Sequence, residues 1–369
     1  MSALATAVVA LPGLAALIVA AGWRRGAGAA RLSILASAGA FGLSVLLAVL
    51  VGTSGPVSAV LETPSGNALG GLYVDRLGSI LLMLVLGVAA TVQGFASRYL
   101  AGDVRLERFF WSSSLLVAAT AAMIAAATLI GLALAWSLAG LALCLLLGLY
   151  AGFPDADDGV RRTRRAFIAG DAALWAAVAV AVAAWGNLDL RGLGDQAPGL
   201  DPGGAVLALV ACLLVVAALA RSAQLPLQGW LPATLAAPTP VSALLHAGVI
   251  NAGGILLVRL SPIFGASSLA THLAFFAGAA TAVYGTALML AKPDIKGALA
   301  HSTMGQMGFM VMACSLGAFA AAIFHLVAHG MYKATLFLGA DSVVHNDKRR
   351  AIVPQPAPAG AAWPRRVRL

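Results

Sequence analysis

Long runs of apolar residues, separated by short polar stretches, repeat along most of the chain. A transmembrane helix needs about 20 mostly apolar residues, so one run of about 40 must be divided into two helices. The pattern then predicts eleven transmembrane helices. They are expected at 3–22, 32–52, 77–97, 109–128, 130–150, 166–185, 204–222, 241–260, 268–290, 298–316 and 318–341.

The helical pattern is interrupted between residues 222 and 241, although this stretch stays apolar. It contains Gln224-Leu-Pro-Leu-Gln-Gly-Trp-Leu-Pro and then Pro238-Thr-Pro240. Prolines and glycine break helices. Irregular backbone at membrane depth is tolerated where it is buried in protein or lines a cavity. We therefore expect an interrupted helix here.

The composition agrees with a membrane protein. Of the 369 residues, 61% are hydrophobic and 10% are charged, and the mean hydropathy is +0.93. Ordinary soluble domains carry about 25% charged residues. A soluble enzyme, a nucleic-acid binder and a secreted disulfide scaffold are therefore excluded. The three cysteines lie far apart in apolar runs, without disulfide or zinc spacing. The predicted class is an all-α polytopic membrane protein.

The net charge of +9 follows the predicted topology. With the N-terminus outside and eleven alternating helices, 18 of the 23 Lys and Arg residues fall on the inner side and three on the outer side. This distribution obeys the positive-inside rule and predicts a cytoplasmic C-terminus. No basic residue precedes the first apolar run, which indicates a first span rather than a cleaved signal peptide.

A few ionisable residues fall within the predicted spans, where such groups are functional candidates by default. His325, His329 and Lys333 are spaced i, i+4 and i+8, which places them on one helix face. Imidazole both accepts and donates a proton near neutral pH, and a neighbouring lysine adds a second carrier. This stripe predicts a proton relay. The other candidates are Asp171, Arg221, His246 and His301.

Each candidate also has a structural explanation. A single histidine in an apolar helix is more often a hydrogen-bonded core residue, but two histidines and a lysine on one stripe favour the relay. The His325–His329 pair also suits a metal, although no neighbouring Glu, Cys or carboxylate supports this. Asp171 and Arg221 lie at the ends of spans, where side chains reach the interface. His301 lies near Lys292, Asp294 and Lys296 and is equally consistent with the interface.

The sequence contains no Walker motif, dinucleotide fingerprint, CxxC or GxSxG. We therefore predict no cofactor, no bound metal and no catalytic site in this chain. Proton or cation movement, coupled to a partner, remains as the function.

Several motifs resemble the antiporter-like proton-translocating membrane subunit family, which includes subunit L of respiratory complex I and the large subunit of Mrp antiporters. The resemblance covers Leu72 to Val344. It rests on Arg221-Ser-Ala-Gln-Leu-Pro-Leu-Gln-Gly-Trp-Leu-Pro, Ala237-Pro-Thr-Pro-Val-Ser-Ala-Leu-Leu-His246-Ala, Lys292-Pro-Asp-Ile-Lys296, Ser302-Thr-Met-Gly-Gln-Met-Gly308 and His325-Leu-Val-Ala-His329-Gly-Met-Tyr-Lys333-Ala.

Within this family the chain resembles the membrane subunit of DAB-type inorganic carbon transporters. The similar segments are His246–Gly254, Arg98–Asp103 and Gln306–Met310. Arg221 stands where the respiratory subunits carry a lysine, and Ser137 where they carry a glutamate. Arginine stays charged, and serine lacks the carboxylate of glutamate. Both departures therefore argue against an unmodified complex I half-channel.

The resemblance implies inverted helical repeats with interrupted helices and a polar axis across a bacterial inner membrane. It also implies a large soluble zinc subunit, similar to a β-carbonic anhydrase, as the partner. This chain would move protons or sodium to energise uptake of CO2 or bicarbonate. The alternatives are a proton-pumping subunit of complex I or an Mrp-type antiporter, and a non-conducting structural subunit.

In this interpretation Asp171, Arg221 and His246 serve a first half-channel, and His325, His329 and Lys333 connect to a second. Further candidates on the pathway are Lys296, His301 and Ser137. Three regions are expected: N-terminal helices and an outside loop at 1–70, an antiporter-like core at 71–345, and a basic, disordered tail at 346–369. Family members continue past the eleventh span, so the second repeat is expected to be incomplete.

Overall fold

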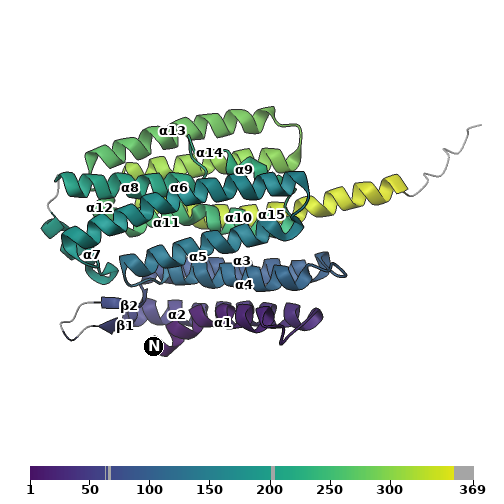
Figure 1. Ribbon diagram of the computed structural model, residues 1–369, viewed down its shortest axis with the longest axis horizontal. Coiled ribbons are helices and arrows are strands. Elements are labelled where there is room, and N and C mark those ends of the chain that lie inside the picture. The colour runs from purple at the N-terminus through teal and green to yellow at the C-terminus, as the bar shows by residue number, and fades with distance from the viewer. Residues whose placement is uncertain (63, 65–67, 201–203, 353–369) are drawn as a thin grey trace, which may run out of the picture.

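The computed structural model describes residues 1–62, 64, 68–200 and 204–352, with side chains omitted at 196–198 and 340–352. Each of the eleven predicted spans coincides with a helical segment, and the long helices lie along one common axis (Figure 1). The segments are α1 (Ser2–Ala20), α2 (Ala27–Ser54), α3 (Arg76–Tyr99), α4 (Leu106–Ile124), α5 (Leu129–Leu147), α6 (Pro154–Trp185), α8 (Ala205–Arg221), α10 (Thr239–Ala247) with α11 (Ala252–Arg259), α13 (Ser268–Ala291), α14 (Ile295–Ser315) and α15 (Phe319–Ile352).

Within the described ranges, eight helical segments are long and apolar enough to cross a membrane. These are α1, α2, α3, α5, α6, the α10–α11 segment, α13 and α15. Of the other three predicted spans, α8 is apolar but has only 17 residues. α4 and α14 carry polar and charged side chains within their length. The chain is a multi-pass, all-α membrane protein.

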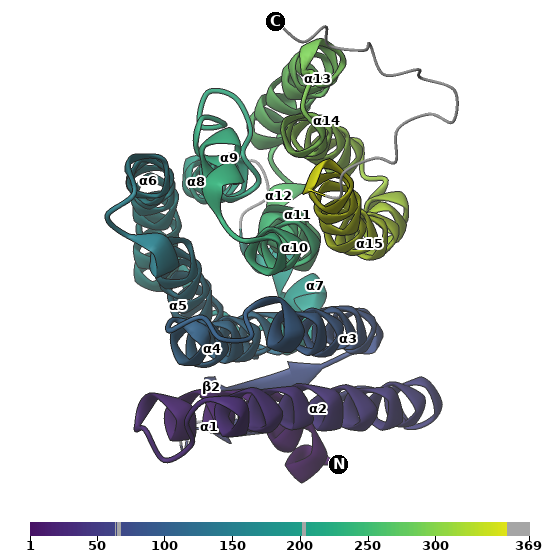
Figure 2. The same cartoon turned by 90° about the vertical axis from the view of Figure 1, so that its right-hand side faces the viewer.

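Seen along the helix axes, the helices form layers (Figure 2). α1 and α2 make an outer row that packs on a second row formed by α3 and α4. α5 and α6 continue from α4 along one side, while α13, α14 and α15 lie on the other. α8, α10 and α11 occupy the space between these two sides. The α10–α11 segment is almost fully buried, so its polar side chains lie inside the protein.

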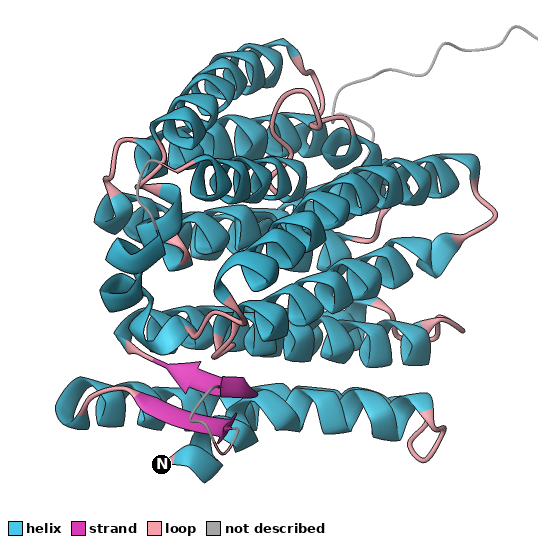
Figure 3. Ribbon diagram, turned by 60° about the vertical axis from the view of Figure 1, so that its left-hand side comes forward, coloured by secondary structure: helices cyan, strands magenta, loops and turns pink. Residues whose placement is uncertain are grey.

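A β-hairpin caps one end of the bundle (Figure 3). Strands β1 (Val57–Glu62) and β2 (Ala68–Val74) pair antiparallel, with Val57 opposite Val74. Single bridges join Leu72 to Ala126 and Thr128 to Asp189. The sequence predicts only an outside loop here. The strands are short and β2 contains two adjacent glycines, which weakens the alternation that marks a strand.

Arg259 ties this end of the bundle together. Its Nη1 donates to Asp75 Oδ2 at 2.6 Å, and its Nη2 donates to the carbonyls of Tyr73 and Ile124 at 3.3 and 3.5 Å. The Asp75 side chain also caps α3 by accepting from Gly78 N at 2.7 Å. Only 8% of the Arg259 side chain is exposed. One guanidinium therefore links α11 to the hairpin, to α3 and to the end of α4.

We expect Arg259→Gln to destabilise the protein by about 2 kcal/mol, because hydrogen bonds to charged groups contribute roughly 1.5–3 kcal/mol. The measurement is denaturant unfolding of the purified chain in detergent micelles. Arg76→Gln is the matched control, because Arg76 is exposed at the same end. Equal stability of the two variants would contradict this role for Arg259.

The predicted interruption is present, and a second one lies beside it. α8 ends at Arg221, and the chain passes through turns to the short α9 (Trp230–Ala233) before α10 begins. α10 in turn ends at Ala247, and a 3-10 turn at Val249–Asn251 separates it from α11. Ser222 Oγ donates to the carbonyl of Ile250 at 2.8 Å. This hydrogen bond joins the two irregular segments inside the protein. Backbone N–H and C=O groups at membrane depth need such hydrogen-bond partners, because lipid offers none.

The C-terminal boundary differs from the expected one. α15 continues to Ile352, so the first residues of the expected tail are helical. Residues 353–369 lie outside the described part of the chain, and the predicted disorder there stays a prediction.

Candidate functional site

Arg221 is the centre of a first buried group, formed with Asp171, Trp136 and Phe167 and called here the Arg221 group. Arg221 Nη2 donates to Asp171 Oδ1 at 2.9 Å and to the carbonyl of Trp136 at 3.1 Å. The indole Nε1 of Trp136 donates to the same Asp171 Oδ1 at 2.9 Å. The carboxylate on α6 thus faces one neutral donor from α5 and one charged donor from α8.

Two aromatic rings enclose the guanidinium. Its Cζ lies 4.5 Å from the Trp136 ring centroid and 4.2 Å from that of Phe167, which is cation–π distance. A Cβ on Gly140 would come within 2.8 Å of Arg221 Nη1, so the glycine leaves room for the charge. Arg221 is 2% exposed and Asp171 is 24% exposed. The arginine is thus enclosed within the protein, whereas the carboxylate stays partly exposed.

Ser137 lies beside this group but does not contact the ion pair in the described structure. Its Oγ accepts from Trp175 Nε1 at 3.1 Å, a contact between α5 and α6. The negative charge opposite Arg221 comes from Asp171 on α6. Because arginine keeps its proton at physiological pH, the Arg221 group holds a fixed cation paired with the Asp171 carboxylate.

Lys333 is the centre of a second buried group. Its Nζ donates to the carbonyl of Leu299 at 3.1 Å and to the hydroxyl of Ser302. The side chain is 1% exposed. No carboxylate neutralises it in the part of the chain that the structure describes. Lys333 is therefore a buried cationic side chain held by neutral oxygens.

The histidines of α15 continue the stripe from Lys333. His329 Nδ1 lies 2.5 Å from Gln306 Oε1, and the His325 and His329 rings stack with centroids 5.9 Å apart. The Nε2 atoms of both rings are buried and have no protein partner among the described residues. Buried polar atoms without a partner call for ordered water. The predicted i, i+4, i+8 spacing thus places His325 and His329 side by side on the helix that carries Lys333.

His246 joins this second group rather than the first. Its Nδ1 lies 3.0 Å from Thr303 Oγ1, and its ring stacks on Phe337 of α15 with centroids 4.3 Å apart. The sequence interpretation assigns His246 to a first half-channel with Asp171 and Arg221. The structure separates them because α10 packs against α14 and α15 at this position.

α14 supplies the partners of the whole row. Leu299, Ser302, Thr303 and Gln306 recur at helical spacing and hold Lys333, His246 and His329. We call this set, with His325, the Lys333 group. The sequence marks the Ser302–Gly308 stretch as a motif but does not identify its members as site residues. Polar residues spaced three and four apart in an apolar helix are the signal that could have found them.

The remaining two candidates lie near the start of α14. His301 is 4% exposed, and its Nδ1 lies 2.8 Å from the carbonyl of Gly297 one turn earlier. Lys296 Nζ lies 3.5 Å from the carbonyl of Ala237 just before α10. The structure therefore places both on the helix that holds the Lys333 group. His301 is buried within the bundle.

The described residues contain no cluster of three or more His, Cys, Asp or Glu side chains suited to a metal ion. What the two groups do offer is titratable and hydrogen-bonding side chains on helices that pack near two interruptions. That arrangement suits the transfer of protons or small cations.

Comparison with known protein families shows which family this chain belongs to. Residues 126–354 match the model "NADH:quinone oxidoreductase/Mrp antiporter, TM", and residues 64–110 match "NADH-Ubiquinone oxidoreductase (complex I), chain 5 N-terminus". The chain belongs to the proton-translocating antiporter-like subunit family. The first match includes both the Arg221 group and the Lys333 group.

Two relatives show the range of this antiporter-like family. The "Probable inorganic carbon transporter subunit DabB1" of Halothiobacillus neapolitanus is 40% identical over 294 residues, which are 78% of this chain and 52% of the relative. The "NADH-quinone oxidoreductase subunit L" of Mycobacterium tuberculosis is 35% identical over 350 residues, which are 92% of this chain and 55% of the relative. The chain thus spans about half the length of these relatives.

Among solved structures, the Mrp complex from Dietzia sp. DQ12-45-1b contains a similar chain. The TM-score is 0.78 and the identity is 31%, covering 90% of this chain and 37% of that one. The antiporter-like membrane fold is therefore confirmed. Relatives in this family, by their names, are subunits of larger membrane assemblies.

Proposed function

We propose that this chain is the cation-conducting membrane subunit of an inorganic carbon uptake system. The 40% identity to an inorganic carbon transporter subunit, beside 35% to a respiratory subunit L, carries the proposal. Arg221 supports it, because an arginine at this position resembles the carbon-transporter pattern, and its buried guanidinium is paired with Asp171. The cation moved is a proton or sodium.

In this proposal the Lys333 group transfers the cation. Lys333 exchanges its proton with the buried imidazoles of the row, whose free Nε2 atoms connect through water. The fixed charge of Arg221 repels a cation that approaches from the Lys333 side. The Asp171 carboxylate attracts the same cation. The pair therefore acts as an electrostatic element of the pathway and Lys333 as its titrating element.

The partner we propose is a large soluble zinc protein similar to a β-carbonic anhydrase, bound at the cytoplasmic face. Zinc and the hydration of CO2 belong to that partner, and cation movement through this chain makes hydration effectively one-way. The membrane is the bacterial plasma membrane. We place the N-terminus and the hairpin outside and the end of α15 inside, because the positive residues gather at the latter end.

The test is growth in air of bacterial cells that lack carbonic anhydrase. Cells expressing this chain together with the soluble zinc protein encoded near it should grow, whereas either protein alone should fail. Absence of growth, with both proteins found in the membrane fraction, would contradict the proposal. A gene neighbourhood of quinone-oxidoreductase subunits would instead favour the second candidate, a proton-pumping subunit of complex I or an Mrp-type antiporter.

The similarity to subunit L over 92% of this chain is the observation behind that second candidate. A third, a non-conducting structural subunit, predicts that Lys333 and His329 variants behave like the wild type.

A further inference from the structure

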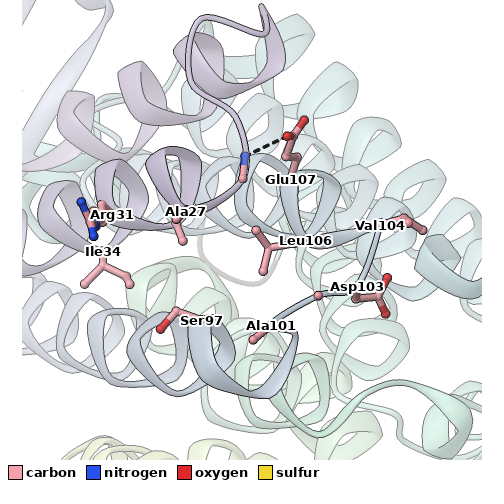
Figure 4. Close-up of a pocket in the computed structure, with 12 residues that line it drawn as sticks. Ala27, Arg31, Ile34, Ser97, Ala101, Asp103, Val104, Leu106 and Glu107 are labelled. Carbon is pink, nitrogen blue, oxygen red and sulfur yellow. Dashed lines mark hydrogen bonds between the residues drawn. The ribbon is translucent and has the colours of Figure 1, made fainter.

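A cavity of about 570 Å³ opens at the end of the bundle away from the hairpin, and Figure 4 shows the residues that line it. It lies between the start of α2, the end of α3 and the start of α4. Its walls are mostly small and apolar, formed by Ala27, Ala30, Ile34, Ala101 and Leu106, with the Ser97 hydroxyl as a polar point. It is separate from the Arg221 group and the Lys333 group.

This end of the first four helices is strongly basic. Residues 22–31 and 97–108 contain six arginines and two carboxylates. The predicted apolar spans begin at 32 and end at 97 in these helices, so the cavity straddles the border between apolar helix and polar connection. Of these charged residues, Arg31, Asp103 and Glu107 line the cavity itself, and the other arginines surround its mouth in sequence only.

The two carboxylates on the cavity wall already have donors. Asp103 Oδ2 accepts from the Tyr150 hydroxyl at 2.6 Å, and its Oδ1 accepts from Arg105 N at 2.8 Å. The hydrogen bond from Tyr150 is the main reason that the pKa of Asp103 lies below its usual value. Glu107 Oε1 accepts from Gly26 N at 2.8 Å, the bond drawn in Figure 4.

Arg31 is the cationic side chain among the described residues that line the cavity. It lies across the cavity from Asp103 in Figure 4 and is exposed. In the described part of the chain no carboxylate forms an ion pair with it. An arginine without a carboxylate partner at the rim of an apolar cavity is a binding group for phosphate, which guanidinium recognises well.

We propose that this cavity binds the headgroup of an anionic phospholipid. Arg31 contacts the phosphate, and an acyl chain lies along Ile34 and Leu106. A single arginine near the membrane surface attracts an anionic lipid headgroup by about 1 kcal/mol, or about fivefold in affinity, and the hydrogen bonds already made by Asp103 and Glu107 leave Arg31 as the free charge among the described residues of the cavity. The inference rests only on this end lying at a membrane surface and does not depend on the proposed transport function.

The test is native mass spectrometry of the purified full chain, counting bound lipid during titration with phosphatidylglycerol. We expect the wild type to bind one phosphatidylglycerol more tightly than phosphatidylcholine. Arg31→Gln should weaken binding about fivefold, the effect of losing one arginine near an anionic lipid. Ala101→Trp should abolish binding without changing charge, because the indole fills the cavity.

Arg98→Gln is the matched control, since Arg98 is exposed at the same end but does not line the cavity. Unchanged binding in this variant supports a specific site. Equal weakening by Arg98→Gln and Arg31→Gln would overturn the proposal in favour of diffuse attraction. Inorganic phosphate that competes as well as the lipid would show a free-anion site and would also overturn it.

Discussion

Lys333→Met is expected to abolish inorganic carbon uptake while the protein still assembles in the membrane. Methionine approaches the length of the lysine side chain but carries no proton, so the Lys333 group loses its titrating member. Proton transfer by a positioned side chain contributes about a hundredfold or more in rate. We expect a loss of at least this order in the initial rate of labelled carbon uptake by cells that also express the soluble partner.

The Lys333→Arg variant tests whether transport needs a proton that Lys333 can release or only its positive charge. Arginine keeps the positive charge and the donors to Leu299 and Ser302, but it does not release its proton at physiological pH. We expect this variant to be inactive too. Lys292→Met is the matched control, because Lys292 is exposed in the connection between α13 and α14. Uptake by Lys333→Arg at the wild-type rate would show that charge alone is needed and would contradict titration.

Asp171→Asn is expected to destabilise the chain by about 3 kcal/mol. The substitution leaves the Arg221 guanidinium buried without its counter-charge, and breaking a buried pair from one side costs roughly 3–5 kcal/mol. We choose the lower end because Asp171 is 24% exposed. The measurement is denaturant unfolding in detergent micelles. Asp158→Asn is the control, because Asp158 pairs with two exposed arginines of α6, and surface pairs contribute about 0–1 kcal/mol.

The double variant Asp171→Asn/Arg221→Met separates stability from function. Removing both charges relieves the unpaired guanidinium, so most of the lost stability should return. Transport should stay low, because the pathway then lacks both its fixed cation and its carboxylate. Equal stability of Asp171→Asn and Asp158→Asn would contradict the buried ion pair. A double variant that transports normally would remove the pair from the pathway.

The helices could be predicted from the sequence because burial in lipid demands long apolar runs. All eleven expected ranges contain helices, and the interruption after Arg221 follows from its prolines and glycine. The hairpin of β1 and β2 could not be predicted in the same way. Its stability comes partly from Leu72 bridging to Ala126 and from Arg259 of α11, which are long-range contacts that no local pattern reveals.

The sequence could indicate which residues are candidates for the site, but only partly which of them lie together. The row on α15 follows from helical spacing within one element, and the structure places its side chains as expected. The position of His246 could not be inferred in this way, because it depends on how α10 packs against α15. The role of α14 could not be predicted from the sequence for the same reason. Ser302, Thr303 and Gln306 can hydrogen-bond Lys333, His246 and His329 only where α10, α14 and α15 pack together.

The most direct test of the central claim is labelled carbon uptake with and without an ionophore that collapses the cation gradient. Cells lacking carbonic anhydrase would express this chain and its soluble zinc partner. The account predicts that the ionophore lowers carbon uptake by the wild type to background. It also predicts that uptake by the Lys333→Met variant is at background without any ionophore. Uptake that is insensitive to every ionophore, and unchanged in Lys333→Met, would contradict a cation-conducting role for this chain.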